Sequence, residues 1–409
     1  MKRIAMISLH GDPTASVGCE GAGGQNVYVR ELARSLAGAG TAVDVFTENL
    51  AGSRTEAESF GPSCRVVRIP ISRPRQVGRH AFWDKLPGFL EKLEDTWPEL
   101  PRYDLVHSHY WLAGWVGLKL AARRRLPLVH TSHSLGRVKV AAGFPLPDAT
   151  DRFATEEQLA RESLLVATNR REATNLANLY RARKVAIVPC GFDPRRFQPL
   201  DRERCRLEAG LDPADRVLLF VGRFDPNKGL AGLLRATQLL ARRWNVQLVV
   251  IGGVRPDSPD KAEAQRIKEL ARDLGLEDRI RFLGAVDHAR LGRYYSAADV
   301  TVVPSYYESF GLVALEAMAC GSPVVASRTG GLACTIQDGE NGILVEPGNV
   351  RRLAAAIARI LSDPALKERL GSAGRERAFR SYTWPGVAQR MLAVYQDALE
   401  SPVLRGAAR

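Results

Sequence analysis

The chain has 409 residues, of which 45% are hydrophobic and 25% charged, as in an ordinary soluble globular protein. This composition excludes a disordered or fibrous chain, and the length predicts two domains, because one domain usually holds about 100–200 residues. The net charge of +13 indicates a solvated, arginine-rich surface with some attraction for small anions. No nucleic-acid-binding motif accompanies the charge, so a nucleic-acid partner is not expected.

The spacing of the cysteines and the length of the apolar runs exclude several kinds of site and segment. None of the six cysteines forms a Cys-x-x-Cys pair, so neither a zinc site nor a thioredoxin-like motif is expected. The apolar run at 4–9 is too short for the core of a signal peptide. No stretch approaches the ~20 apolar residues that span a bilayer. We therefore expect a cytoplasmic protein without a membrane span; the sequence leaves the oligomeric state open.

The first half of the chain alternates between strand and helix patterns. Residues 3–9 predict a buried strand, a Gly-rich loop follows at 11–24, and the apolar spacing predicts a helix over 26–39. Such alternation is typical of a parallel sheet covered by helices on both faces. Further strands are expected at 42–47, 66–69, 105–107, 128–130, 164–168 and 185–188.

The pattern then begins again. Prolines at 189, 194 and 199 mark a linker, and a new first strand is expected at 216–222. The sequence therefore predicts an α/β fold with two doubly wound domains, 1–192 and 200–382, whose ligand sites at the strand ends face each other across a cleft. Later elements are strands at 247–251, 280–282, 300–303 and 323–326, and helices at 260–274 and 383–400.

Two loops have the composition of anion sites. Gly23 and Gly24 lie in a Gly-rich loop between a strand and a helix, where the backbone can approach an anion at the helix N-terminus. Their spacing matches neither the dinucleotide fingerprint nor Walker A, so a plain turn remains an alternative. In the second domain, Arg223 and Lys228 precede a helix and suit a diphosphate, unless they are incidental charges of an exposed loop.

The segment 307–316 carries two carboxylates around a helix start. Glu308 stands in the loop and Glu316 follows about two helical turns later. Ionised carboxylates accept from hydroxyl groups, so a ligand rich in hydroxyls is expected here, although Glu308 alone could be a helix cap. The backbone N–H groups at this helix start belong to Phe310, Gly311 and Leu312.

Three histidines stand at strand ends. His107 and His109 have no third metal ligand at a suitable spacing, so a structural role is expected for them. His133 follows another strand, at the edge where active sites form. The chain has no Asp-x-Asp pair. A diphosphate site is therefore expected to use Arg, Lys and helix dipoles; no cofactor should be required, and a divalent ion such as Mg²⁺ should stimulate at most.

Together these residues resemble the retaining glycosyltransferases of the GT-B fold, in the group 1 family that contains sucrose-phosphate synthase. The resemblance spans nearly the whole chain. It implies that Arg223 and Lys228 bind the diphosphate of a sugar nucleotide, that Glu308 contacts the donor sugar and that Glu316 contacts the ribose. His133 would hydrogen-bond the donor sugar near the reacting centre. The last helix, 385–409, would cross back onto the first, acceptor-binding domain.

The N-terminal half resembles two branches of that family. Gln25 and residues 133–137 resemble sucrose-phosphate synthase, whereas Asn26 and residues 108–111 resemble the N-acetylglucosaminyltransferase of mycothiol synthesis. Both accept a phosphorylated sugar or polyol, and UDP-glucose with fructose 6-phosphate is the favoured pair. The alternatives are UDP-N-acetylglucosamine with inositol 3-phosphate, free fructose as acceptor, a sugar-nucleotide epimerase or a non-catalytic sensor. The acceptor positions are Gln25, Asn26, Lys85, Tyr110, Ser134, Lys139 and Arg152.

Overall fold

The computed structural model describes the chain except residues 16–22, 50–53, 72–82, 253–259 and 402–409. It divides into two compact units. The first holds the chain up to Pro189 together with the last helix, and the second holds Cys190–Thr383. The α/β class expected from the sequence is confirmed in both units. Among the described helices, none combines the length and apolar character that a membrane crossing needs.

Unit 1 is built on one sheet with the strand order β3-β4-β2-β1-β5-β6-β7-β8 in the described residues. Its strands pair in parallel except β3, which runs antiparallel to β4. The central strands are buried on both faces because they are short runs of Ile, Val, Leu and Ala. Their bounds are β1 Arg3–Ile7, β2 Ala42–Asn49, β3 Glu56–Gly61, β4 Cys64–Pro70, β5 Leu105–His109, β6 Leu128–Thr131, β7 Leu164–Ala167 and β8 Val185–Ile187.

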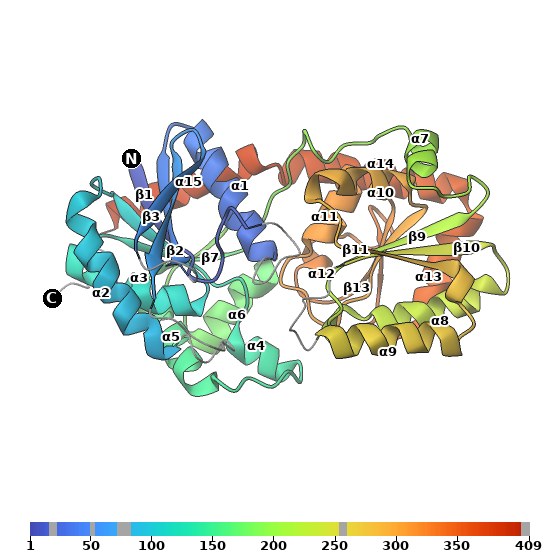
Figure 1. Cartoon of the computed structure of the whole chain (residues 1–409), viewed down its shortest axis with the longest axis horizontal. Helices are drawn as coiled ribbons and strands as arrows, with labels where there is room; N and C mark the ends of the chain where they lie inside the picture. The colour runs from blue at the N-terminus through green and yellow to red at the C-terminus, as the bar shows by residue number, and fades with distance from the viewer. Residues whose placement is uncertain (16–22, 50–53, 72–82, 253–259, 402–409) are drawn as a thin grey trace. The chain divides into compact units, whose positions relative to one another are not determined.

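Helices cover both faces of this sheet (Figure 1). The helices α2, α3, α5 and α6 contribute to the main apolar cluster on one face. On the other face α1 and α15 pack together, and Tyr28 of α1 meets Trp384 of α15 with ring centroids 5.5 Å apart. The bounds are α1 Gly24–Gly38, α2 Leu86–Thr96, α3 Trp111–Arg124, α4 Gly136–Ala141, α5 Ala149–Glu162, α6 Arg170–Tyr180 and α15 Trp384–Glu400.

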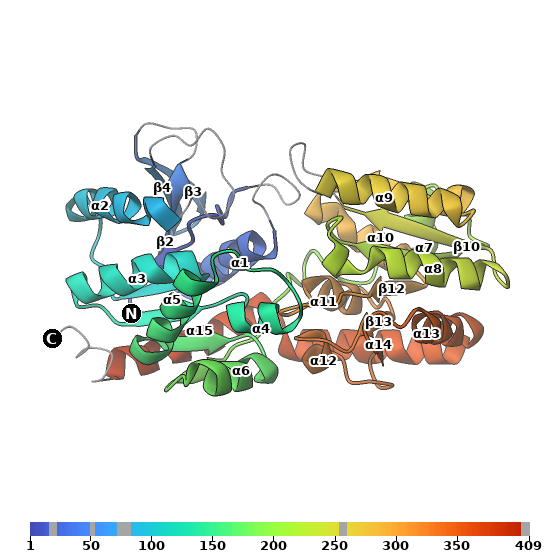
Figure 2. The same cartoon turned by 90° about the horizontal axis from the view of Figure 1, so that it is seen from below.

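Unit 2 repeats the design with an all-parallel sheet ordered β11-β10-β9-β12-β13-β14 in the described residues. The helices α8, α9 and α13 lie on one face and α7, α10, α11 and α14 on the other, and Figures 1 and 2 show α8 and α9 side by side. The strands are β9 Arg216–Val221, β10 Val246–Ile251, β11 Ile280–Gly284, β12 Val300–Val303, β13 Val324–Ser327 and β14 Ile343–Val345. The helices are α7 Arg202–Glu208, α8 Leu230–Ala241, α9 Asp260–Asp273, α10 Leu291–Ala297, α11 Leu312–Ala319, α12 Leu332–Thr335, α13 Val350–Ser362 and α14 Pro364–Ser381.

The strand predictions agree with the structure wherever the sequence shows an apolar run. Two strands were not predicted. The first, β3, spans Glu56–Gly61 at the sheet edge. Its residues are mostly exposed and polar, so its sequence contains no apolar run. The second, β14, has only three residues, Ile343–Val345. Their omission changes neither the class of the fold nor the position of the strand ends that carry the candidate site residues.

Candidate functional site

In unit 2, three loops at the carboxyl ends of β9, β12 and β13 pack directly on one another. Two glycines make this possible. A Cβ at Gly229 would lie 2.1 Å from the carbonyl oxygen of Pro304, and a Cβ at Gly330 would lie 1.7 Å from that of Glu308. The amide of Asn227 also donates to the carbonyl of Tyr307 over 2.9 Å. The loops therefore hold each other in place through their backbones.

These loops bring Lys228 and Glu308 together. The Lys228 Nζ lies 2.7 Å from Glu308 Oε2, and both side chains are partly exposed. Arg223 stands on the same loop as Lys228, where its Nη2 donates to Asp225 Oδ2 over 3.2 Å. The Arg223 pair is the more exposed of the two and is weak, about 0–1 kcal/mol, so an anion can compete for this cation. The geometry suits a diphosphate at Arg223 and Lys228 with a hydroxyl donor at Glu308.

The loop that carries Glu308 leads into the uncapped start of α11. Gly311 is the N-cap residue with φ +93°, a conformation that favours glycine, and no side chain caps the helix. Phe310 is buried and packs edge-on against Tyr382. The backbone N–H groups at Leu312 and the residues beside it are those that a helix start leaves without intrahelical partners.

Glu316 lies deeper than the sequence suggested. Its carboxylate is buried and accepts from His288 Nε2 over 2.8 Å and from the Tyr295 hydroxyl over 2.9 Å. The structure therefore groups Glu316 with η5 (His288–Arg290) and α10, whereas Glu308 stands with Lys228. To bind the Glu316 carboxylate, a ribose hydroxyl would have to replace the hydrogen bonds from His288 and Tyr295.

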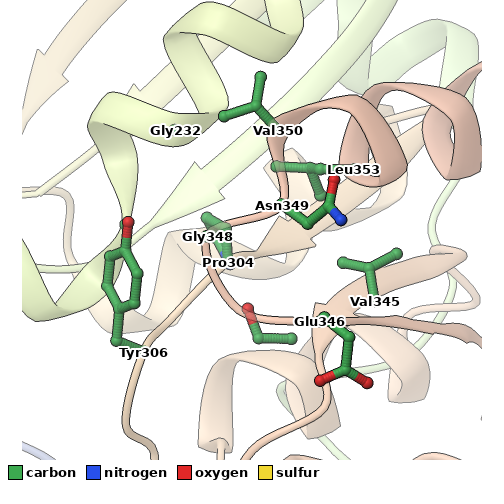
Figure 3. Close-up of a pocket in the computed structure, with 11 residues that line it drawn as sticks. Gly232, Pro304, Tyr306, Val345, Glu346, Gly348, Asn349, Val350 and Leu353 are labelled. Carbon is green, nitrogen blue, oxygen red and sulfur yellow. The ribbon is translucent and has the colours of Figure 1, made fainter.

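An open hollow of about 260 Å³ lies beside the same loops, between the starts of α8 and α13 (Figure 3). Tyr306 and Pro304 line one part of it, and another part is lined by Val345, Glu346, Gly348, Asn349, Val350 and Leu353. Its charged lining residue is Glu346, and no Lys or Arg lines it among the described residues. The hollow therefore does not suit a diphosphate, and the cations of the unit lie elsewhere.

In unit 1, Arg152 brings three of the predicted acceptor residues together. Its Nη1 donates to the Tyr110 hydroxyl over 3.2 Å, and its Nη2 donates to the Ser134 carbonyl over 2.8 Å and to Ser134 Oγ over 3.1 Å. The guanidinium also lies over the Tyr110 ring, 5.1 Å from its centroid. We call Arg152, Tyr110 and Ser134 the arginine cluster.

The counter-charge of the arginine cluster is Glu156, which sequence reasoning missed. Glu156 Oε1 accepts from Arg152 Nε over 2.8 Å, and both side chains are buried. The same carboxylate accepts from the Gly136 backbone N–H and from the Tyr180 hydroxyl. A buried guanidinium needs such a partner because desolvating an unpaired charge is costly. The i,i+4 spacing of Arg152 and Glu156 on α5 was the available signal.

Tyr110 has a strained backbone. It lies between β5 and α3 with φ +73° and ψ +153°, a region that is essentially reserved for glycine. Such a conformation costs about 1–3 kcal/mol and persists only where the surrounding structure fixes it. Here the bond from Arg152 and the edge-on contact with His10 hold the ring. Strain of this kind is concentrated at functional sites.

The other predicted residues of unit 1 lie around these elements. Gln25 Nε2 donates to Ser8 Oγ over 3.1 Å, and Asn26 Nδ2 donates to the Asp12 carbonyl over 2.9 Å. Asn26 Oδ1 accepts from the N–H of Gly23, and Gly24 begins α1. Both amides thus hold the loop between β1 and α1; residues 16–22 of that loop lie outside the described residues.

The two predicted lysines stand on separate elements. Lys85 precedes α2, and its charge acts on Glu48, whose pKa burial raises to about 8. Glu48 lies next to the last residue of β2, and its Oε2 has no hydrogen-bond partner among the described residues. Lys139 lies in α4, whose first residue, Gly136, donates to Glu156. Glu48 is a second buried carboxyl that sequence reasoning missed.

The histidines form a buried group. His107 Nδ1 lies 2.7 Å from the Tyr395 hydroxyl of α15, and its Nε2 lies 2.9 Å from Thr131 Oγ1. This bonding ties α15 to the sheet, which is the structural role expected of His107. His109 Nδ1 lies 3.0 Å from His133 Nε2. In the described part of the chain, no group of His, Cys, Asp or Glu is arranged to hold a metal ion.

Comparison with known proteins identifies the family. The model of "Glycosyl transferases group 1" matches residues 201–377, and that of "Glycosyltransferase Family 4" matches residues 22–196. D-inositol 3-phosphate glycosyltransferase 2 of Catenulispora acidiphila is 39% identical over 98% of this chain and 96% of its own. The corresponding enzyme of Acidothermus cellulolyticus is 38% identical over 97% of this chain and 91% of its own.

A solved structure agrees with these matches. Sucrose-phosphate synthase of Thermosynechococcus elongatus is 39% identical, covers 97% of this chain and 99% of its own, and superposes with a TM-score of 0.90. The resemblance to the GT-B glycosyltransferases and the fold expected from it are thereby confirmed. The chain belongs to the glycosyl transferases group 1 family and is a nucleotide-sugar-dependent glycosyltransferase of the GT-B fold.

Proposed function

We propose that this enzyme transfers a glucosyl group from UDP-glucose to fructose 6-phosphate and retains the configuration of the transferred sugar. The arginine cluster is the observation that carries the proposal. The hydroxyls of Tyr110 and Ser134 both accept hydrogen bonds from Arg152, so each directs its own O–H proton elsewhere. Two hydroxyl donors polarised by one guanidinium suit the oxygens of a phosphate group.

The names of the relatives fit an acceptor of this class. One is an inositol 3-phosphate glycosyltransferase and another a sucrose-phosphate synthase, and both names include a phosphorylated polyol or sugar. Gln25 and residues 134–136 favour fructose 6-phosphate, as in sucrose-phosphate synthase. The second candidate is transfer of N-acetylglucosamine to inositol 3-phosphate. The identity of 39% over 98% of the chain to an enzyme of that name favours it.

Under this proposal, Arg223 and Lys228 bind the diphosphate, together with the backbone N–H groups at the start of α11. Glu308 accepts from a hydroxyl of the donor sugar, and His133 contacts the same sugar. The bond between C1 and the diphosphate oxygen breaks while C1 bonds to the acceptor oxygen on the same face. The oxygen released from C1 keeps the bonding electron pair, so one negative charge develops on the diphosphate for the cations to stabilise, and the acceptor proton passes to that leaving phosphate.

The experiment is a matrix of UDP-, ADP- and GDP-sugars against fructose 6-phosphate, fructose and inositol 3-phosphate, read by mass spectrometry. UDP-glucose with fructose 6-phosphate should give the fastest reaction, and NMR of the fresh product should show an α linkage. Turnover with inositol 3-phosphate alone would establish the second candidate, and a β linkage would refute retention. Because the cations are side chains, EDTA should leave most of the activity; complete loss restored by Mg²⁺ would contradict a metal-free donor site.

A further inference from the structure

His133 is held by its backbone and by two neighbouring rings. It follows β6 with φ +57°, in the left-handed region, which turns its ring back toward β5. There its Nε2 lies 3.0 Å from Nδ1 of His109, and the Tyr28 ring contacts it edge-on with centroids 4.9 Å apart. The other ring nitrogen, Nδ1, makes no hydrogen bond within the described residues, and the side chain is partly exposed. We call Nε2 of His133, which is bonded to His109, the committed nitrogen, and we call Nδ1 the open nitrogen.

The committed nitrogen can be assigned a role because both rings are neutral. Burial lowers the pKa of both histidines below the ordinary value, so each ring carries one N–H. His109 is fully buried, and its Nε2 has no hydrogen-bond partner among the described residues. If His109 donates from Nδ1, its unpaired nitrogen Nε2 carries only a lone pair. If His109 accepts at Nδ1, its proton is on Nε2, where it is a buried N–H without an acceptor.

A buried N–H without an acceptor is the costlier outcome, and orphaned donors are rarer in proteins than orphaned acceptors. His109 therefore donates from Nδ1 to Nε2 of His133. The proton of His133 is then on Nδ1, the open nitrogen. The ring of His109 is itself supported by His107, whose centroid lies 4.1 Å away and which Tyr395 and Thr131 bond from either side.

We propose that His109 is a positioning residue that fixes the tautomer of His133, so that His133 presents an Nδ1–H donor to a hydroxyl of the transferred sugar. The direction of the bond to the sugar rests on the proposed contact of His133 with the donor. The tautomer itself does not depend on that contact. A wrong assignment of the tautomer can therefore be distinguished from a wrong proposal for the reaction.

The tautomer is measured in the wild-type protein without substrate. The enzyme is labelled with ¹⁵N-histidine, and the ring nitrogens are recorded in long-range proton–nitrogen correlation spectra. The His133 signals are those that His133→Gln removes. A pyrrole-type shift at Nδ1 and a pyridine-type shift at Nε2 are expected. The reverse pattern at His133 would overturn the proposal, whatever the enzyme's substrates are.

A pair of substitutions tests the positioning role. The amide nitrogen of an asparagine at 109 can reach the place of Nδ1 and donate, whereas leucine cannot. His109→Leu should lower kcat by about 10–100-fold with little change in the donor KM, by analogy with removal of the outer partner of a ligating histidine. His109→Asn should restore most of kcat. Equal losses in the two variants, at equal melting temperatures, would contradict the assignment.

The matched control is His130, a buried histidine of β6 that bonds Ser108 Oγ over 2.8 Å. His130→Leu removes an imidazole from the same sheet without touching the hydrogen bond to His133. It should lower the melting temperature but leave the His133 ring shifts in place and kcat within about threefold of wild type. A loss of kcat as large as that of His109→Leu would show that the effect is general damage to the sheet, against the proposal.

Discussion

The two cationic regions of this enzyme balance their charges by different means. In unit 1 the guanidinium of Arg152 is 1% exposed and is neutralised by Glu156 within the fold. In unit 2 the Arg223 side chain is 44% exposed and meets Asp225 on its own loop. A buried cation must have its counter-charge before the ligand arrives, whereas an exposed cation can exchange water for the ligand.

This difference predicts how each region uses its charge. The arginine cluster is preformed, so its hydroxyls are already oriented by Arg152 when a phosphate binds. The loops of Arg223 and Lys228 carry weak pairs that a diphosphate displaces. Substitutions in unit 1 should therefore affect folding and acceptor choice together, and substitutions in unit 2 should affect turnover with little effect on folding.

The largest effect is expected from Arg152→Met. It leaves Glu156 buried without its cation, and breaking a buried pair in this way costs about 3–5 kcal/mol of unfolding free energy. Urea denaturation measures the loss. The double variant Arg152→Met with Glu156→Gln should recover most of the stability, yet neither variant should prefer a phosphorylated acceptor. A single variant as stable as wild type would show that the pair is not buried in solution.

Arg223→Ala and Lys228→Ala should each lower kcat by ~10²–10³-fold, or ~3–4 kcal/mol, as when an oxyanion-stabilising donor is removed. Their unfolding free energies should stay within about 1 kcal/mol of wild type, because exposed pairs contribute little. Arg235, an exposed arginine of α8 whose Nη1 donates to the Ala231 carbonyl of the same helix, is the control, and Arg235→Ala should keep full turnover. Near wild-type turnover in both test variants would remove the diphosphate assignment.

The pH dependence of stability should report the histidine group of unit 1. Burial lowers the pKa of His130 to about 3, below the ordinary value of 6.5 that it regains on unfolding. The unfolded chain thus binds more protons below pH 6.5, so stability is complete above that pH and falls as the pH drops toward 3. Each such histidine adds a slope of up to about 1.4 kcal/mol per pH unit.

Urea denaturation at pH 7.5, 6 and 5 checks this slope, with His130→Asn as the comparison. In this variant, the slope of unfolding free energy against pH should be smaller by about the contribution of one histidine. His288 of unit 2, which pairs with Glu316, is the control position, because its substitution removes no histidine of unit 1. A wild-type stability that is unchanged between pH 7.5 and 5 would contradict neutral, buried imidazoles.

The sequence predicts what depends on local pattern and misses what depends on distant contacts. Apolar runs such as Val246–Ile251 revealed the strands because both faces of the sheets are buried, while polar β3 left no such pattern. The members of the arginine cluster were expected from family resemblance. The bond from Tyr180 to Glu156 and the pairing of His109 with His133 each join residues 24 positions apart, which spacing alone does not show.

The prediction for Glu316 shows the same limit. The sequence placed Glu316 about two helical turns after Glu308, but α11 begins at Leu312, so only about one turn of helix precedes Glu316. The spacing did not show that His288 and Tyr295 come from η5 (His288–Arg290) and α10 to occupy its carboxylate. Hydrogen-bond partners supplied by another helix depend on how the helices pack, and no local motif encodes them.

The most direct test of the central claim, that the arginine cluster selects a phosphorylated acceptor, is one ratio. It is kcat/KM for fructose 6-phosphate divided by kcat/KM for fructose, measured in wild type, Tyr110→Phe and Tyr103→Phe. Tyr103 is a control tyrosine in the same unit, buried and bonded to Asp44. The ratio should be ~10² or more in wild type and Tyr103→Phe, and at least about tenfold lower in Tyr110→Phe. A wild-type ratio near one would contradict the account.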